Sequence, residues 1–305
     1  MTNRIIEISD PLVSLSMSRG FMLVKISNEE KSRIAVEDIG TLILNGTGAS
    51  ITTNLLNSML EAGVMVIVLG ANYSPSGIFY PTDPHYLHKQ KINLQIASSK
   101  PLEKRLWQQV VKAKILNQAS ILSFFTSEDE KQLFELAKKV SSGDKENLEA
   151  QAARKYWQRL FGSDFRRNFE STGINSMLNY GYAILRSATA RAIFASGLHP
   201  AIGIHHTNQE NAFCLVDDLM EPFRPIVDFV VKKISEETGK IDELTPEIKR
   251  SLTKILSLDL STSAGTTPII NCLTRLCQSF VRSLENGEAN LDFPLSPLPT
   301  ELIIS

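Results

Sequence analysis

The spacing of hydrophobic residues changes near residue 85, and this change limits the possible folds more than any other feature. Before it, apolar residues form short runs between glycines and polar residues, as in Phe21–Ser27, Ser32–Asp38 and Gly40–Gly46. Such runs are typical of β-strands. From about Asn93 onward, apolar residues recur at i, i+3, i+4 and i+7, which is typical of helices. The polar segment YPTDPHYLHKQK separates the two patterns.

The sequence therefore predicts an α+β protein with a small β-rich N-terminal domain, residues 1–85, and a larger all-helical domain, residues 93–290. Spaced prolines in DFPLSPLP predict an extended tail over residues 291–305. Strands and helices do not alternate, which argues against a Rossmann fold or a TIM barrel.

One helix is expected inside the β-rich domain. Ser50 can cap its N-terminus and Gly63 can end it. The run Val64–Gly70 then predicts a strand buried on both faces. The segment PSGIFYPTDP has the composition of turns.

Composition excludes several classes of protein. No stretch approaches the roughly 20 apolar residues of a membrane-spanning helix, and MTNRIIEISD lacks the apolar core of a secretory signal. The three cysteines show no CxxC spacing, which argues against a zinc finger or a disulfide scaffold and favours a reducing cytoplasm. The net charge of −1 gives no bulk reason to expect nucleic acid, although local carboxylates can mask a basic groove.

The segment GIHHTNQENAFCLVDDLMEPFRP concentrates groups that bind metal ions. On a helix, Asp218 and Glu221 are at i, i+3, and Asp217 and Glu221 are at i, i+4. Like charges at these spacings repel, and a bound divalent cation would turn the repulsion into coordination. The alternative is an ordinary helix N-terminus, where acidic residues are favoured and where Pro222 and Pro225 fit.

Two further features favour a metal site. His205 and His206 lie just upstream, and imidazole with carboxylates suits Mg²⁺ or Mn²⁺. Glu149 lies on the apolar stripe of a predicted helix, where a carboxylate is costly unless it is paired or bound to metal. An ion pair, with Arg154, Lys155 or an arginine of another helix, is the structural alternative.

Three segments carry a resemblance to a known family: LEAQAARKYWQRLFG, GINSMLNYGYAILRSATARAIFASGLHPAIGIHH and LVDDLMEPFRPIVD. They resemble the CRISPR-associated integrase, the large subunit of the spacer-acquisition machinery, in the version closest to type II systems. The resemblance spans nearly the whole chain. It implies a β-rich dimerisation domain before a helical catalytic domain.

The resemblance also implies an activity and a set of site residues. Glu149, His206 and Glu221 match the catalytic metal ligands, Asp218 matches a further acidic position at the metal, and His205 is a supporting candidate. The metal would be Mg²⁺ or Mn²⁺. The family inserts captured DNA fragments into a CRISPR repeat array by transesterification, with the fragment 3′-hydroxyl as nucleophile. The same site cuts branched DNA.

The partners implied are double-stranded DNA (the captured fragment and the repeat), a second copy of the chain and a small ferredoxin-like adaptation subunit. The type II effector nuclease and a ring-forming DNA-end-binding protein complete the set. Two alternatives remain open: a stand-alone metal-dependent nuclease acting on branched DNA, and a non-catalytic DNA-binding scaffold. Six arginines are candidates for phosphate contacts or for partners of the acidic cluster: Arg154, Arg166, Arg167, Arg186, Arg191 and Arg224.

Overall fold

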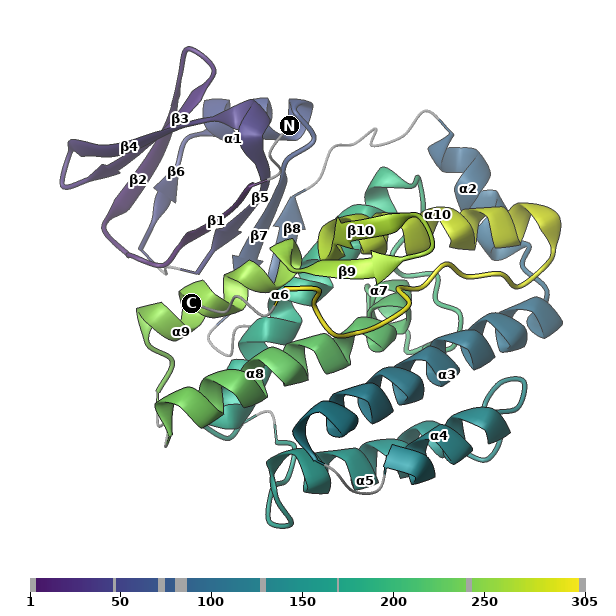
Figure 1. Ribbon diagram of the computed structural model, residues 1–305. Helices are drawn as coiled ribbons and strands as arrows, with labels where there is room; N and C mark the ends of the chain where they lie inside the picture. Colours follow the sequence, from purple (N-terminus) through teal and green to yellow (C-terminus); the bar gives the residue numbers. More distant parts are fainter. Residues whose placement is uncertain are drawn as a thin grey trace. The chain divides into compact units, whose positions relative to one another are not determined.

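The chain forms two compact units, Met1–Tyr86 and Leu87–Ser305, in a computed structural model. The structure describes residues 4–45, 48–70, 75–79, 87–126, 130–168, 170–239 and 243–301. Figure 1 labels the elements of both units.

The N-terminal unit contains two four-stranded sheets and one helix. In the first sheet the order is β1-β5-β7-β8, with only the β7–β8 pair antiparallel. In the second the order is β4-β3-β2-β6, with only the β2–β6 pair parallel. The bounds are β1 Arg4–Ile8, β2 Val13–Ser18, β3 Phe21–Ile26, β4 Glu29–Ala35, η1 Val36–Asp38, β5 Ile39–Leu44, β6 Ser50–Ile51, α1 Thr53–Glu61, β7 Met65–Leu69 and β8 Pro75–Phe79.

Burial explains this arrangement. β5 and β7 are the central strands of the first sheet, and five of the six residues of β5 are buried, so both of its faces lie against apolar side chains. Leu55 and Met59 of α1 are fully buried and join a core that includes Leu15, Met22 and Val66.

Most of the predicted strands are present in this unit, with three corrections. Thr52 caps α1, because the helix begins at Thr53 and Leu55 N donates to the Thr52 hydroxyl; Ser50 lies in β6 instead. The prediction of turns after residue 74 is wrong over Pro75–Phe79, which forms β8. β1 and β2 were not predicted.

The second unit is built mainly of helices. α3, the longest, lies beside α4 and α5 (Figure 1). The bounds are α2 His88–Ile96, α3 Lys100–Phe125, α4 Glu130–Lys139, α5 Leu148–Phe161, α6 Ile174–Ala195, α7 Cys214–Met220, η2 Glu221–Phe223, α8 Arg224–Thr238, α9 Pro246–Thr253, η3 Lys254–Ser257, β9 Asp259–Thr262, β10 Gly265–Pro268 and α10 Ile269–Asn286.

A helical second unit after a β-rich first unit confirms the predicted fold class, although the second unit is not entirely helical. β9 and β10 form an antiparallel hairpin that packs on α10 (Figure 1). The chain after α10 hydrogen-bonds back to this hairpin, through Leu295 N to Ser261 O and Thr300 N to Asp259 O. Among the described residues, no helix is both long enough and apolar enough to cross a bilayer.

Candidate active site

Glu149 stands in the first turn of α5, which is fixed from two sides. Asn147 caps the helix from a left-handed backbone conformation (φ 52°), and its side chain accepts from Ala150 N. Asp144 accepts from the backbone N–H groups of Leu148 and Glu149 at 2.9 and 3.0 Å. Capping groups at this end satisfy the free N–H groups of the first turn. They hold the Glu149 side chain, which is 25% exposed, in one place.

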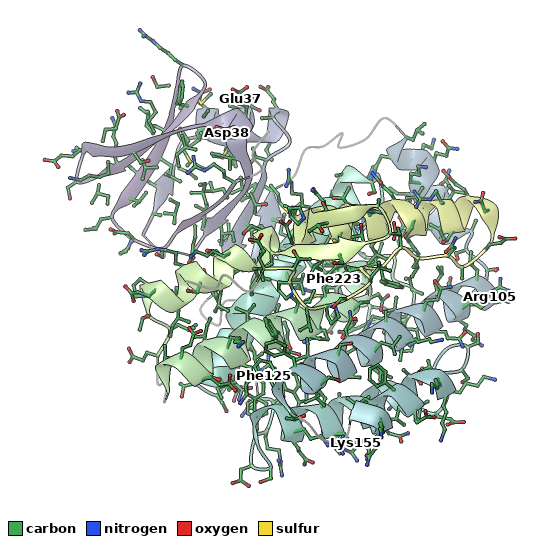
Figure 2. The ribbon with its side chains drawn as sticks, in the orientation of Figure 1. Glu37, Asp38, Arg105, Phe125, Lys155 and Phe223 are labelled. Atoms are coloured by element: carbon green, nitrogen blue, oxygen red, sulfur yellow. The ribbon has the colours of Figure 1, made fainter. Side chains whose placement is uncertain are left out.

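Lys114 of α3 joins Glu149 to Glu221. Its Nζ lies 2.5 Å from Glu149 Oε1 and 2.5 Å from Glu221 Oε2, so the two carboxylates lie within twice that distance of each other. Burial lowers the pKa of Lys114, but the charges of Glu221 and Glu149 outweigh burial and raise that pKa above its usual 10.5. The ion pair considered for Glu149 is therefore made with α3. Lys155 instead lies exposed on α5 (Figure 2) and contacts Gln132.

Glu221 begins the short 3₁₀ segment η2 and is buried, with 6% of its side chain exposed. Arg224 Nη1 donates to its Oε1 at 2.6 Å. Burial raises the pKa of Glu221, but the charges of Arg224 and Lys114 outweigh burial and lower it from 4.5 to about 2. Oε2 meets Lys114 as an ion pair, and no donor among the described residues is aligned with it for a hydrogen bond. Glu221 thus carries a buried acceptor that is not fully satisfied.

Arg224 is held by a buried polar group behind it. Its guanidinium lies 4.3 Å from the centre of the Tyr182 ring, and the Tyr182 hydroxyl donates to Asp228. Burial raises the pKa of Asp228 to about 7, against the opposing effects of Tyr182 and Arg224. The neighbouring Phe223, labelled in Figure 2, is fully enclosed. This packing restricts Arg224 to the Glu221 side of the site.

Asp218 organises the loop that carries the two histidines. It is fully buried in α7, and Oδ2 accepts from Ile204 N at 2.6 Å and His205 N at 3.0 Å. Oδ1 accepts from His206 N at 3.3 Å and lies 2.6 Å from His206 Nδ1. With Nδ1 donating to this carboxylate, Nε2 keeps the lone pair of the ring. Asp218 therefore fixes the loop through Oδ2 and places His206 through Oδ1.

The pKa of His206 depends on nearby carboxylates, including that of Glu221. The hydrogen bond to Asp218 is the largest cause of a raised His206 pKa; burial opposes it, and the charges of Asp218 and Glu221 add to it. His205 stacks on Trp107 of α3, with ring centres 4.2 Å apart and planes 2° from parallel. The Trp107 ring also meets His206 edge-on at 5.8 Å. Trp107 therefore supports both histidines.

Gly203 lies at the start of the loop that carries His205 and His206, at a position with no room for a side chain. A Cβ at this position would lie 2.5 Å from His206 O, 2.9 Å from Asp218 Oδ2 and 2.9 Å from Cys214 Cβ. We expect Gly203→Ala to lower the free energy of unfolding by about 2 kcal/mol, because the loop must move off Asp218 to relieve the overlap. Urea unfolding followed by circular dichroism measures this loss. Gly77→Ala is the control, since a Cβ there meets nothing within 4 Å; equal stability of the two variants would contradict the close approach.

Asp217, Asp218 and Glu221 were predicted to lie close together on one helix face. In the structure each of these carboxylates contacts a different partner. Asp217 pairs with Arg186, whose Nε and Nη2 lie 2.6 and 3.0 Å from its two oxygens. Asp218 faces the histidine loop and Glu221 faces Lys114 and Arg224. The expected repulsion is therefore removed within the protein itself, by ion pairs and backbone N–H groups.

At least four of the six candidate arginines make internal hydrogen bonds. Arg224 and Arg186 pair with Glu221 and Asp217. Arg167 donates to Asn175 and Asn179 at 2.9 and 2.6 Å. Arg166 donates to the backbone oxygens of Ser163 and Phe165 at 2.7 and 2.9 Å, although it is exposed. Arg154 is exposed as well. Arg191 is half-buried, and burial lowers its pKa.

The site thus combines two carboxylates and an imidazole from three segments of the helical unit. Across the described residues, no three His, Cys, Asp or Glu side chains are already grouped so as to hold an ion. Lys114 and Arg224 occupy the oxygens of Glu221 instead. The donor types still fit a divalent cation, because carboxylate oxygens suit Mg²⁺ or Mn²⁺ and imidazole binds transition-metal ions. Glu221 Oε2 is also buried without an aligned donor.

Sequence reasoning missed Lys114 and Trp107. A signal for Lys114 was available in LWQQVVKAKILNQAS: it falls on the helical stripe of Val110, Val111 and Ile115, all of which are buried. Lys112, two residues earlier, is exposed. A lysine on the buried face of a helix requires a carboxylate partner from elsewhere in the fold.

Known proteins are similar to this chain in sequence and in fold. The family model described as CRISPR associated protein Cas1 matches residues 7–243. A CRISPR-associated endonuclease Cas1 of Neisseria meningitidis serogroup C (strain 8013) is 37% identical over 277 residues, which cover 90% of each chain.

Two solved structures share the fold. A casposase bound to integration product has a TM-score of 0.83 at 20% identity and covers 99% of this chain and 96% of its own. A Cas6-RT-Cas1–Cas2 complex has a TM-score of 0.78 at 17% identity and covers 97% of this chain and 36% of its own. The family model and the Neisseria relative show that the chain belongs to the CRISPR-associated Cas1 family.

Proposed function

We propose that this protein is a divalent-metal-dependent DNA integrase and endonuclease. In this proposal it inserts captured DNA fragments into a CRISPR repeat array by transesterification, with the fragment 3′-hydroxyl as nucleophile. The observation that supports it most is that Glu149 and Glu221 approach one cation, Lys114 Nζ, while the charge of Glu221 helps to raise the pKa of the Asp218-held His206. The names of the relatives agree with it: one is an endonuclease, and one was solved bound to an integration product.

Glu149, Glu221 and His206 would hold the Mg²⁺ or Mn²⁺ ion. When bound, such an ion polarises a phosphate oxygen and stabilises the charge that develops during phosphoryl transfer. The protein's own groups prepare this site. Asp218, predicted from the sequence as a further ligand, positions His206 in our proposal, because its oxygens already accept from Ile204, His205 and His206.

We also propose the partners with which this protein assembles. Double-stranded DNA, a second copy of this chain and the small ferredoxin-like adaptation subunit are the proposed partners, with the type II effector nuclease and a ring-forming DNA-end-binding protein as further members. A similar fold occurs in a complex named as containing Cas1 and Cas2. The exposed Arg154 and Arg166 are the proposed phosphate contacts among the six arginines.

An integration assay tests the proposal. The purified protein is incubated with a short DNA duplex and a supercoiled plasmid that carries a CRISPR repeat, with and without the small subunit. We expect joined product at the repeat with Mn²⁺ or Mg²⁺ and the small subunit, and none with chelator, because the charge on the phosphate then lacks its cation. Product formed in chelator would contradict the metal site. Cutting of branched DNA with no joining, whether or not the subunit is present, would favour the stand-alone nuclease.

A further inference from the structure

Lys114 is a buried cation between two carboxylates of the proposed metal site. It is only 9% exposed and lies on the inner face of α3 beside the fully buried Val110, Val111 and Ile115. Its Nζ contacts one oxygen of Glu149 and one of Glu221, each at 2.5 Å. An ammonium in such a place stabilises two carboxylates that would otherwise repel each other.

We propose that Lys114 is an internal counter-cation that competes with the divalent metal for Glu149 and Glu221. Lys114 releases these oxygens when the metal binds, and its ammonium then becomes available to a DNA phosphate. This inference rests on the proposed function, because it takes Glu149 and Glu221 as metal ligands. It adds a positioning and regulatory role for a residue that sequence motifs did not indicate.

The charges of the site support competition. Glu149 and Glu221 are balanced by Lys114 and Arg224, so the four groups are already neutral without a metal. A divalent ion adds two positive charges to a poorly solvated place, which is unfavourable unless negative charge enters with it. DNA phosphates supply that charge. Metal and DNA are therefore expected to bind cooperatively.

Lys114 is better suited to move than Arg224. The Arg224 guanidinium is packed 4.3 Å from the centre of the Tyr182 ring and donates to Glu221 Oε1. Lys114 ends in a compact ammonium on a flexible four-carbon stem, with three donors that can turn to a new acceptor. It also holds Glu221 Oε2, the oxygen without an aligned hydrogen-bond donor. Lys114 is therefore the cation that leaves the two carboxylates when the metal binds.

Metal affinity tests this inference without any activity measurement. Chelator-treated full-length protein is titrated with Mn²⁺ by calorimetry, in the absence of DNA. We expect Lys114→Met to bind Mn²⁺ at least about ten-fold more tightly than wild type. The competing ammonium is gone in this variant, and the site is left with a net negative charge. Lys112→Met, on the exposed face of α3, is the control and should match wild type. Equal or weaker Mn²⁺ binding by Lys114→Met would overturn the proposal.

The coupling to DNA gives a second readout. Adding a short DNA duplex should tighten Mn²⁺ binding to wild type several-fold and to Lys114→Met by a smaller factor, since the variant already lacks one positive charge. An equal factor for both proteins would show that Lys114 does not couple the two ligands.

Glu149→Gln separates failure of this inference from failure of the proposed function. If Glu149→Gln abolishes Mn²⁺ binding while Lys114→Met binds like wild type, the metal site stands and the competition is refuted. If Mn²⁺ affinity is the same with and without Glu149, the ion binds elsewhere and both proposals fall.

A measurement on wild type covers the case in which Lys114→Met does not fold. Ammonium groups held in ion pairs are observed in ¹⁵N-labelled protein by NMR, and the Lys114 signal is assigned by its loss in Lys114→Arg. Saturating Mg²⁺ with the DNA duplex should shift or broaden this signal, because Lys114 leaves the two carboxylates. An unchanged signal at saturation would refute the displacement.

Discussion

His206→Ala should lower strand transfer at least about 100-fold and leave the free energy of unfolding within about 1 kcal/mol of wild type. The His206 side chain is 44% exposed, so little packing is lost with it. Asp218 keeps the backbone N–H groups of Ile204, His205 and His206 as donors. Loss of the ring then removes the proposed imidazole ligand without leaving a bare buried carboxylate. Rates of product formation and urea unfolding curves measure the two effects.

His205→Ala is the matched control in the same loop. Its ring stacks on Trp107 and makes no side-chain contact with Asp218 among those described, so we expect at least about a tenth of wild-type activity. The assignment of His206 fails if His205→Ala is inactive and His206→Ala is active. It also fails if His206→Ala is inactive only because it has unfolded, which the urea curves reveal.

The helical period explains why Glu149 could be named as a candidate site residue. Glu149 and the hydrophobic residues after it fall on one stripe, and α5 begins at Leu148 as that stripe requires. Asp218 and His206 lie in one short segment, and they do contact each other. The strand run at Val64–Gly70 was also clear, because β7 is a continuous apolar run in the centre of a sheet.

The partners of the site residues were much harder to predict. Lys114 contacts Glu149 and Glu221 only because α3, α5 and η2 pack together, and no local pattern contains that contact. The hairpin β9–β10 was missed for a related reason: TSAGTTP is too short to show a strand period, and its pairing depends on the later packing against α10. At α1, Ser50 and Thr52 are both good capping residues, and the β2–β6 pairing decides between them.

Glu221→Ala should be the most destabilising single change at the site, with a loss of about 3–5 kcal/mol in the free energy of unfolding. It leaves Arg224, which is half-buried, without its carboxylate, and it leaves the buried Lys114 with Glu149 alone. Glu149→Ala should cost less, about 1–2 kcal/mol, because Glu149 is partly exposed and Lys114 keeps Glu221. The measurement is urea unfolding at pH 7 in chelator. Tryptophan fluorescence reports on the helical unit, because Trp107 and Trp157 both belong to it.

The pH dependence of stability provides an independent check on Glu221. Its pKa is lowered from 4.5 to about 2 in the folded protein, so its contribution is fully present above about pH 4.5 and is lost as the pH falls toward 2. At about 1.4 kcal/mol per pKa unit, this shift corresponds to roughly 3 kcal/mol, in line with the loss expected for Glu221→Ala. Glu221→Gln should therefore flatten the fall in stability between pH 4.5 and 2, whereas His206→Ala should keep it. If Glu221→Gln and wild type lose stability in parallel over this range, Lys114 and Arg224 do not hold the Glu221 charge in the way the structure shows, and the competition proposed for Lys114 loses its basis.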